Sequence, residues 1–195
     1  MIKTSLFLIG LFAFISAIGQ NDSIQHSKNK NSILISYESL KLDFATASET
    51  GAGITYTRDF FTRGKHNFAF QTSASFIYVI NTSNIYFFGA GALYRYDMSK
   101  RSSLSLSVSG NYVYNRLTFD RFELGDNGEF IEQKSGLHSF APSIGLNYSY
   151  DFLKIKSTTF GVLLGTKVIG LDNGEYTKFL EASKLNISFG FYCKF

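Results

Sequence analysis

The chain ends in Leu185-Asn-Ile-Ser-Phe-Gly-Phe-Tyr-Cys-Lys-Phe195, where two kinds of side chain alternate without a break. One parity, from Leu185 to Phe195, holds only apolar residues; the other, from Asn186 to Lys194, holds Tyr192 and polar or small residues. Alternate side chains of a strand point to opposite faces, so the stretch predicts a strand with one wholly apolar face. Its length matches the roughly 9–11 residues that a tilted strand needs to cross a bilayer.

The composition agrees with a membrane barrel built from such strands. The mean hydropathy of +0.01 is too polar for a helical membrane protein, yet 17% of the 195 residues are Phe or Tyr and Pro occurs once. Only every second residue of a barrel strand meets lipid, which explains many aromatic residues without long apolar runs. A length of 195 residues favours one domain. A soluble secreted β-sandwich is the alternative with similar alternation.

The beginning of the chain has the layout of a secretory leader. A basic start at Lys3 precedes an apolar run over residues 6–18, and Ala17-Ile-Gly19 offers small residues for cleavage. Gln20, not Cys, follows the cleavage site, so a lipid anchor is not expected. We therefore predict a signal peptide over residues 1–19, a flexible periplasmic lead-in over residues 20–31 and a barrel over residues 32–195.

Turn signals divide the remaining chain into about eight alternating segments. An even number places both termini on the periplasmic side of an antiparallel up-and-down barrel. The apolar parity of the first segment changes after Tyr37, which predicts either a β-bulge near Glu38–Ser39 or a strand end other than residue 44. The expected strands cover residues 32–44, 51–60, 67–80, 85–98, 103–119, 137–152, 158–171 and 185–195.

The charges differ between the two ends of this predicted barrel. The short turns of the periplasmic end are basic, and the two long outer loops, residues 120–136 and 172–183, are acidic. The sequence pI of about 9.0 therefore reflects a basic periplasmic rim, not a nucleic-acid surface. The basic residues of the turns are Arg63, Lys65, Lys100, Arg101, Lys154 and Lys156.

Polar residues at inward positions predict the content of the barrel. An eight-stranded barrel is just wide enough to be filled by side chains or to hold one small ligand. Charges removed from water must pair with each other, so we favour a hydrogen-bonded polar plug over a narrow pore for ions or small solutes. The plug candidates are Gln71, Arg95, Asp97, Asn111, Asn147 and Lys167, with Asp151 and Lys194 also expected inside.

Both long loops contain the motif Asp-Asn-Gly-Glu. Asn-Gly is a strong hairpin signal, because both central residues of a type I′ turn need positive φ. The motifs are therefore either simple hairpin tips or the ends of a protruding acidic sheet that could bind an extracellular protein. Their spacing does not match an EF-hand, so no metal is predicted. The candidate tip residues are Asp126, Asn127, Gly128, Glu129, Asp172, Asn173, Gly174 and Glu175.

Leader, alternating strands, basic turns and aromatic C-terminus together resemble the small OmpX/OmpA-type barrels of the Gram-negative outer membrane. The resemblance implies that the barrel-assembly machinery reads Phe191 and Phe195 as its assembly signal. It also implies a monomer surrounded by outer-membrane lipid and lipopolysaccharide, acting in envelope integrity, adhesion or defence without catalysis or a cofactor.

Small barrels also include lipid A deacylases, which use a His and a Ser two positions apart on the lipid face of a strand. Here His138 and Ser139 are adjacent, so they point to opposite faces and cannot form a base–nucleophile pair. Cys193 lies on the apolar parity and reads as a packing residue. The sequence therefore predicts a non-enzymatic outer-membrane barrel, with a narrow pore and a lipid-modifying enzyme as the alternatives.

Overall fold

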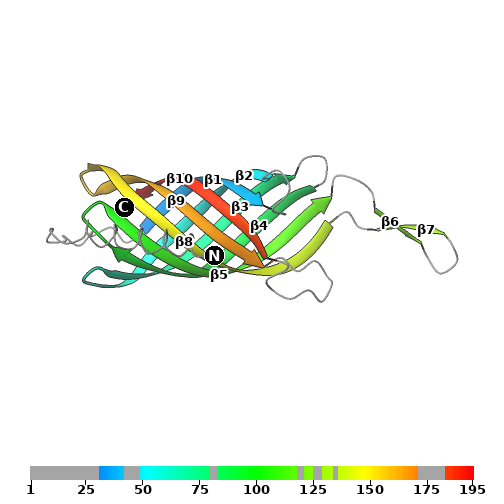
Figure 1. The fold of residues 1–195 in the computed structure, drawn as a ribbon, viewed down its shortest axis with the longest axis horizontal. Coiled ribbons are helices and arrows are strands. Elements are labelled where there is room, and N and C mark those ends of the chain that lie inside the picture. The colour runs from blue at the N-terminus through cyan, green and yellow to red at the C-terminus, as the bar shows by residue number, and fades with distance from the viewer. Residues whose placement is uncertain are drawn as a thin grey trace, which may run out of the picture.

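The computed structural model describes residues 31–41, 49–79, 83–117, 121–124, 129–133, 136–170 and 183–195 (Figure 1). Its regular elements are all β-strands, and no described helix is long and apolar enough to cross a membrane. The strands are β1 Asn31–Lys41, β2 Glu49–Arg63, β3 His66–Val79, β4 Ser83–Asp97, β5 Ser102–Leu117, β6 Arg121–Leu124, β7 Phe130–Gln133, β8 Gly136–Ile155, β9 Thr158–Gly170 and β10 Ser183–Lys194.

Eight strands form a closed antiparallel barrel in the order β1-β10-β9-β8-β5-β4-β3-β2. β1 pairs with β10 from Ser32↔Lys194 to Lys41↔Leu185, and this pairing removes the last sheet edge. Closure leaves no unpaired row of backbone groups facing lipid, where each would cost several kcal/mol. The predicted fold class, an eight-stranded up-and-down barrel, is confirmed.

Both ends of the described barrel chain lie at the same end of the barrel. The amide of Asn31 donates to the Phe195 carbonyl at 3.1 Å, and the Phe195 amide donates back at 2.9 Å. The short connections β2–β3, β4–β5 and β8–β9 lie at this end, which is the periplasmic end of such barrels. The β6–β7 hairpin projects beyond the opposite, outer end (Figure 1).

The outward face has two aromatic belts separated by an apolar band. Near the outer end, ring pairs connect Phe76, Tyr86 and Tyr114 across three strands. Near the periplasmic end, Phe68 and His66 pair with Tyr94 and Tyr96. On β4, Tyr86 and Tyr96 are ten residues apart, which spans about 26 Å of membrane at a tilt of about 40°. That height matches the apolar band of about 25 Å in outer-membrane barrels.

The predicted bulge near Glu38–Ser39 was wrong. β1 pairs continuously with both neighbours from Ser32 to Leu40, so its alternation never changes phase. Leu40 is 0% exposed and points into the barrel, whereas Ile35 and Tyr37 face outward. The apolar character of Leu40 therefore marks an apolar region of the interior, not a shift of face.

Within the described strands two bulges occur elsewhere, both close to periplasmic turns. The β2–β3 register shifts between Asp59 and Phe61, and the β8–β9 register shifts between Asp151 and Leu153. An extra residue at a bulge lets two consecutive side chains share the outer surface. Phe152 and Leu153 are accordingly both exposed. β8 also continues to Ile155, three residues past its expected end, and Ser83 and Asn84 belong to β4 instead of a connection.

Leu164→Arg tests the membrane position of the outward face. Leu164 is exposed at the middle of β9, and Arg at the bilayer midplane costs about 2–4 kcal/mol in a barrel. We expect that loss in the free energy of unfolding, measured with urea in lipid vesicles.

Ile155→Arg is the matched control, because exposed Ile155 ends β8 at the periplasmic rim. Its expected cost is about 0–1 kcal/mol, since an interfacial Arg keeps its hydration. Equal costs for the two variants would contradict this membrane placement.

Candidate functional site: barrel interior and outer hairpin

Ion pairs fill the periplasmic end of the barrel interior. Arg95 on β4 lies 2.5 Å from Asp59 Oδ2 and 3.4 Å from Asp97 Oδ1. Asn67 Nδ2 donates to the other oxygen of Asp97 at 2.8 Å. The Arg95 side chain is mostly buried, so its two carboxylate partners replace water that the interior excludes. We call these four residues the Arg95 network.

A second ion pair lies on another side of the same layer. Lys194 Nζ contacts both oxygens of Asp151, at 2.8 and 3.2 Å. The hydroxyl of Tyr192 also donates to Asp151. The carboxylate on β8 is thereby joined to two side chains of the last strand, next to the β1–β10 closure. These contacts stabilise the closing strand from inside the barrel.

Small polar side chains line the interior along β5 and β8, from the periplasmic end to the middle of the barrel. Ser103 bonds Ser149 at 2.6 Å, and Ser109 bonds Ser143 at 2.8 Å. Asn111, 1% exposed, donates to the Ala141 carbonyl at 2.7 Å. These hydroxyls and this amide each bond to a group on the neighbouring strand, so this part of the interior is polar without a free charge.

A cavity of about 90 Å³ remains at the centre of the barrel. Glu38, Gln71, Asn147 and Lys167 contribute to its wall, together with several serines. Glu38 is 6% exposed, and its carboxylate accepts a hydrogen bond of 2.9 Å from Asn186. A polar space of this size is large enough for several water molecules.

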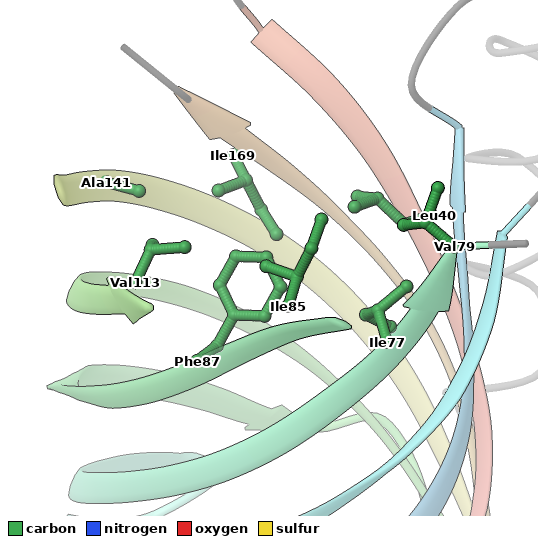
Figure 2. Packing of buried hydrophobic residues seen from close by; sticks show 8 residues of the cluster. All are labelled: Leu40, Ile77, Val79, Ile85, Phe87, Val113, Ala141 and Ile169. Carbon is green, nitrogen blue, oxygen red and sulfur yellow. The ribbon is translucent and has the colours of Figure 1, made fainter. Parts of the chain in front are cut away.

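Apolar side chains close the outer half of the interior (Figure 2). They come from six strands and point toward one another across the lumen. Leu40, Ile77 and Ala141 are 0% exposed. The members of this apolar plug are Leu40, Ile77, Val79, Ile85, Phe87, Val113, Ala141 and Ile169. A packed apolar layer of this kind excludes water and hydrated ions.

The expected plug residues face the interior, at three levels of the barrel. Arg95 and Asp97 lie in the ion-pair layer, Asn111 in the serine layer, and Gln71, Asn147 and Lys167 at the cavity. Apolar side chains, which the sequence analysis did not predict inside the barrel, lie in the outer half of the interior. Sequence reasoning also missed Asp59, Asn67, Glu38 and Asn186. Each of these four residues occupies an inward position in the alternation of its strand, and that alternation was the signal that could have identified it.

The hairpin of β6 and β7 is a separate two-stranded sheet at the outer end. Its register runs from Arg121↔Gln133 to Leu124↔Phe130. Neither strand pairs with another described strand, so each has one open edge. Of the predicted tip residues, the structure places Glu129 in an exposed position. Asp126, Asn127, Gly128, Asp172, Asn173, Gly174 and Glu175 lie outside the described residues, as do residues 1–30 with the predicted leader.

His138 lies on the outward face near the outer rim. Its ring stacks on Tyr114 with a centroid distance of 4.8 Å, and Nδ1 shares a hydrogen bond with the Tyr112 hydroxyl. Ser139 pairs with buried Val113 and shares its inward face. His138 and Ser139 therefore point to opposite sides of the barrel wall. Among the described residues, no group of His, Cys, Asp or Glu could hold a metal ion.

The predicted assembly residues lie on the lipid face at the end of the chain. Phe191 and Phe195 are both exposed, and Phe191 packs edge-on against Phe189 at 5.7 Å between ring centroids. The position is compatible with recognition from the periplasmic side. Their role as an assembly signal stays a prediction.

Solved structures of small outer-membrane barrels are similar to this chain. Neisserial surface protein A matches with a TM-score of 0.52 and 14% identity, over 85% of this chain and 96% of that one. Ail of Yersinia pestis, in complex with the heparin analogue sucrose octasulfate, matches with a TM-score of 0.50 and 12% identity, over 86% and 99%. These likenesses show the fold, the small outer-membrane barrel that the sequence predicted.

Other comparisons add less. The outer-membrane enzyme PagL matches with a TM-score of 0.44 and 8% identity, over 83% of this chain and 97% of that one. At that score it carries no conclusion about catalysis. No protein-family profile matches the sequence, and no curated protein matches it.

Replacing Arg95 tests the ion-pair layer. Arg95→Met leaves Asp59 and Asp97 without their cation, and breaking a buried pair costs about 3–5 kcal/mol. We expect a loss of that order in the free energy of unfolding in lipid vesicles. The double variant Arg95→Met/Asp59→Asn should recover part of it.

Arg58→Met is the matched control for this experiment, because Arg58 is exposed on the outward side of β2. We expect a change of at most about 1 kcal/mol there. A loss as large as that of Arg95→Met would show that any Arg in this region matters equally.

Planar-bilayer recordings test the closure of the lumen. The unaltered protein is expected to show no steady conductance, because the apolar plug excludes hydrated ions. Leu40→Ser/Phe87→Ser introduces two hydroxyls into the plug and should produce measurable conductance in variants that still migrate as heat-modifiable barrels. Steady conductance of the unaltered protein would contradict the closed lumen.

Proposed function

We propose that this protein is a non-enzymatic outer-membrane barrel that displays an acidic hairpin to a basic partner outside the cell. The β6–β7 hairpin carries the proposal. It is a sheet of its own, beyond the outer end of a barrel whose lumen is closed (Figure 1). A closed barrel provides a firm anchor, and the extended hairpin provides a surface that membrane crossing does not require.

The sequence of the hairpin favours a positively charged partner. Residues 121–133 contain one cation, Arg121, and four carboxylates, those of Glu123, Asp126, Glu129 and Glu132. Complementary charge accelerates encounter and selects among partners. The open edges of β6 and β7 add backbone donors and acceptors that an extended peptide can pair with.

The ligand in the Ail structure has the opposite character. Sucrose octasulfate is a polyanion, and the net negative charge of residues 121–133 disfavours that class of ligand here. We therefore carry over a role at the cell surface to this chain, but not the anionic ligand of the Ail structure.

The surroundings of His138 support a role without catalysis. Its ring contacts Tyr112 and Tyr114 on the outer side of the barrel wall, whereas the adjacent Ser139 faces the inner side. A nucleophile must lie within hydrogen-bond reach of its base. A His stacked in an aromatic belt fits an interfacial anchor instead, because amphipathic rings favour the headgroup level.

The remaining expectations form part of the same proposal. The Arg95 network and the Asp151–Lys194 pair act as a polar plug that keeps the barrel rigid. The barrel is a monomer in outer-membrane lipid and lipopolysaccharide, inserted by the barrel-assembly machinery through Phe191 and Phe195. No cofactor is needed for this role.

Neutralising the hairpin tests the display function. The variant Glu123→Gln/Glu129→Gln/Glu132→Gln removes three negative charges outside the barrel wall. In phosphatidylcholine nanodiscs, we expect binding of fluorescent polylysine to weaken by roughly tenfold relative to the unaltered protein, since several rim charges are lost together.

The matched control removes three charges from the other outer loop, in Asp172→Asn/Glu175→Gln/Glu181→Gln. Its binding should change less than that of the hairpin variant. Equal weakening would assign the effect to overall charge, and unchanged binding of the hairpin variant would refute the proposal.

Lipid A spectra test the absence of catalysis. The spectra from cells with the unaltered protein and from cells with His138→Ala should be identical. An acyl change specific to the unaltered protein would establish an enzyme.

A further inference from the structure

Two opposite charges on the wall of the central cavity do not pair with each other. Glu38 and Lys167 both line this space of about 90 Å³, and neither forms an ion pair with any residue that the structure describes. The other two charged residues of the wall, Arg95 and Lys194, each contact a carboxylate of the ion-pair layer. The fold therefore leaves one anion and one cation beside the same space without a direct counter-charge, an arrangement that is costly away from bulk water.

Neutral groups hold the carboxylate of Glu38 in place. The residue is 6% exposed, Asn186 Nδ2 donates to its Oε2 at 2.9 Å, and the Ser36 hydroxyl donates to its Oε1 at 3.3 Å. Gly53 on the neighbouring strand makes room for this side chain, because a Cβ at that position would overlap Oε1. These contacts fix the direction of the carboxylate, but they do not balance its negative charge.

Lys167 lies across one strand from Glu38. Glu38 of β1 pairs with Ser188 of β10, and Lys167 of β9 pairs with Asn186 of the same strand. Because β10 separates the two residues, their backbones are roughly 10 Å apart across the sheet. Their charged ends can therefore contact opposite ends of one small molecule in the cavity.

The shape of the cavity limits the size of a ligand and its route of entry. A volume of about 90 Å³ admits a molecule the size of a few waters. The wall extends to Ser32 and Lys194, which pair with each other near the periplasmic ends of β1 and β10. The apolar plug closes the outer half of the lumen. A ligand therefore enters from the periplasmic side, past the ion-pair layer.

We propose that the central cavity binds a small zwitterion with the chemistry of an amino acid the size of glycine. The ammonium group of the ligand contacts the Glu38 carboxylate, and its carboxylate contacts the Lys167 ammonium. Hydrogen bonds between charged groups are about twice as strong as those between neutral groups. A ligand with a single charge would leave one of the two wall charges without a partner. The site is separate from the outer hairpin, so failure of either proposal leaves the other untouched.

Equilibrium dialysis of the detergent-refolded barrel against radiolabelled glycine tests this site. Methylamine and acetate are the reference probes, because each is of similar size and carries only one of the two charges. We expect saturable binding of one glycine per barrel, at least tenfold tighter than the binding of either reference probe. Equal affinity for methylamine would assign the cavity to a cation at Glu38 alone, and that result or a lack of saturable glycine binding would overturn the proposal.

Single substitutions test the two contacts separately. Glu38→Gln and Lys167→Met should each weaken glycine binding at least tenfold, since each removes one charged partner. Gln at position 38 keeps an oxygen that can accept from the Asn186 amide. Lys167 is only partly buried, so Lys167→Met keeps the test available if the Glu38 variant does not fold.

The matched control is Glu129→Gln/Lys154→Met, which removes one charge of each sign from exposed positions outside the cavity. It should change glycine binding by less than twofold. A control that loses as much affinity as the cavity variants would show that the effect does not come from the cavity. Heat-modifiable migration confirms that each variant folds.

Discussion

Every backbone amide and carbonyl that crosses the hydrocarbon layer must find its partner within the protein. This chain meets the requirement by pairing β1 with β10, which joins its first described residue to its last. Closure then defines an inside and an outside for every strand. The lipid face, the layered interior and the position of the outer hairpin all depend on that single pairing.

The sequence was sufficient to predict which residues face the lipid, because only that face must be continuously apolar. Alternation correctly predicted eight strands and the outward positions of Phe68, Phe76 and Phe191. The interior was harder, since both polar and apolar side chains can fill a lumen. Leu40 was therefore misread as a change of phase, and that error also hid inward-facing Glu38.

The interior changes its chemistry along the barrel axis. Ion pairs fill the periplasmic end, hydroxyls and a small polar cavity fill the centre, and apolar side chains fill the outer half. The apolar layer could be identified only in the structure, because its members come from six strands and no local pattern connects them. The hairpin register also required coordinates, although Asn-Gly indicated a turn between its strands.

The apolar plug has a consequence for the cell that carries the protein. A barrel that conducts water and ions adds a leak with each copy inserted. Here Leu40, Ile77 and their neighbours seal the outer half of the lumen. A lumen closed in this way uncouples the number of copies in the membrane from the permeability of that membrane.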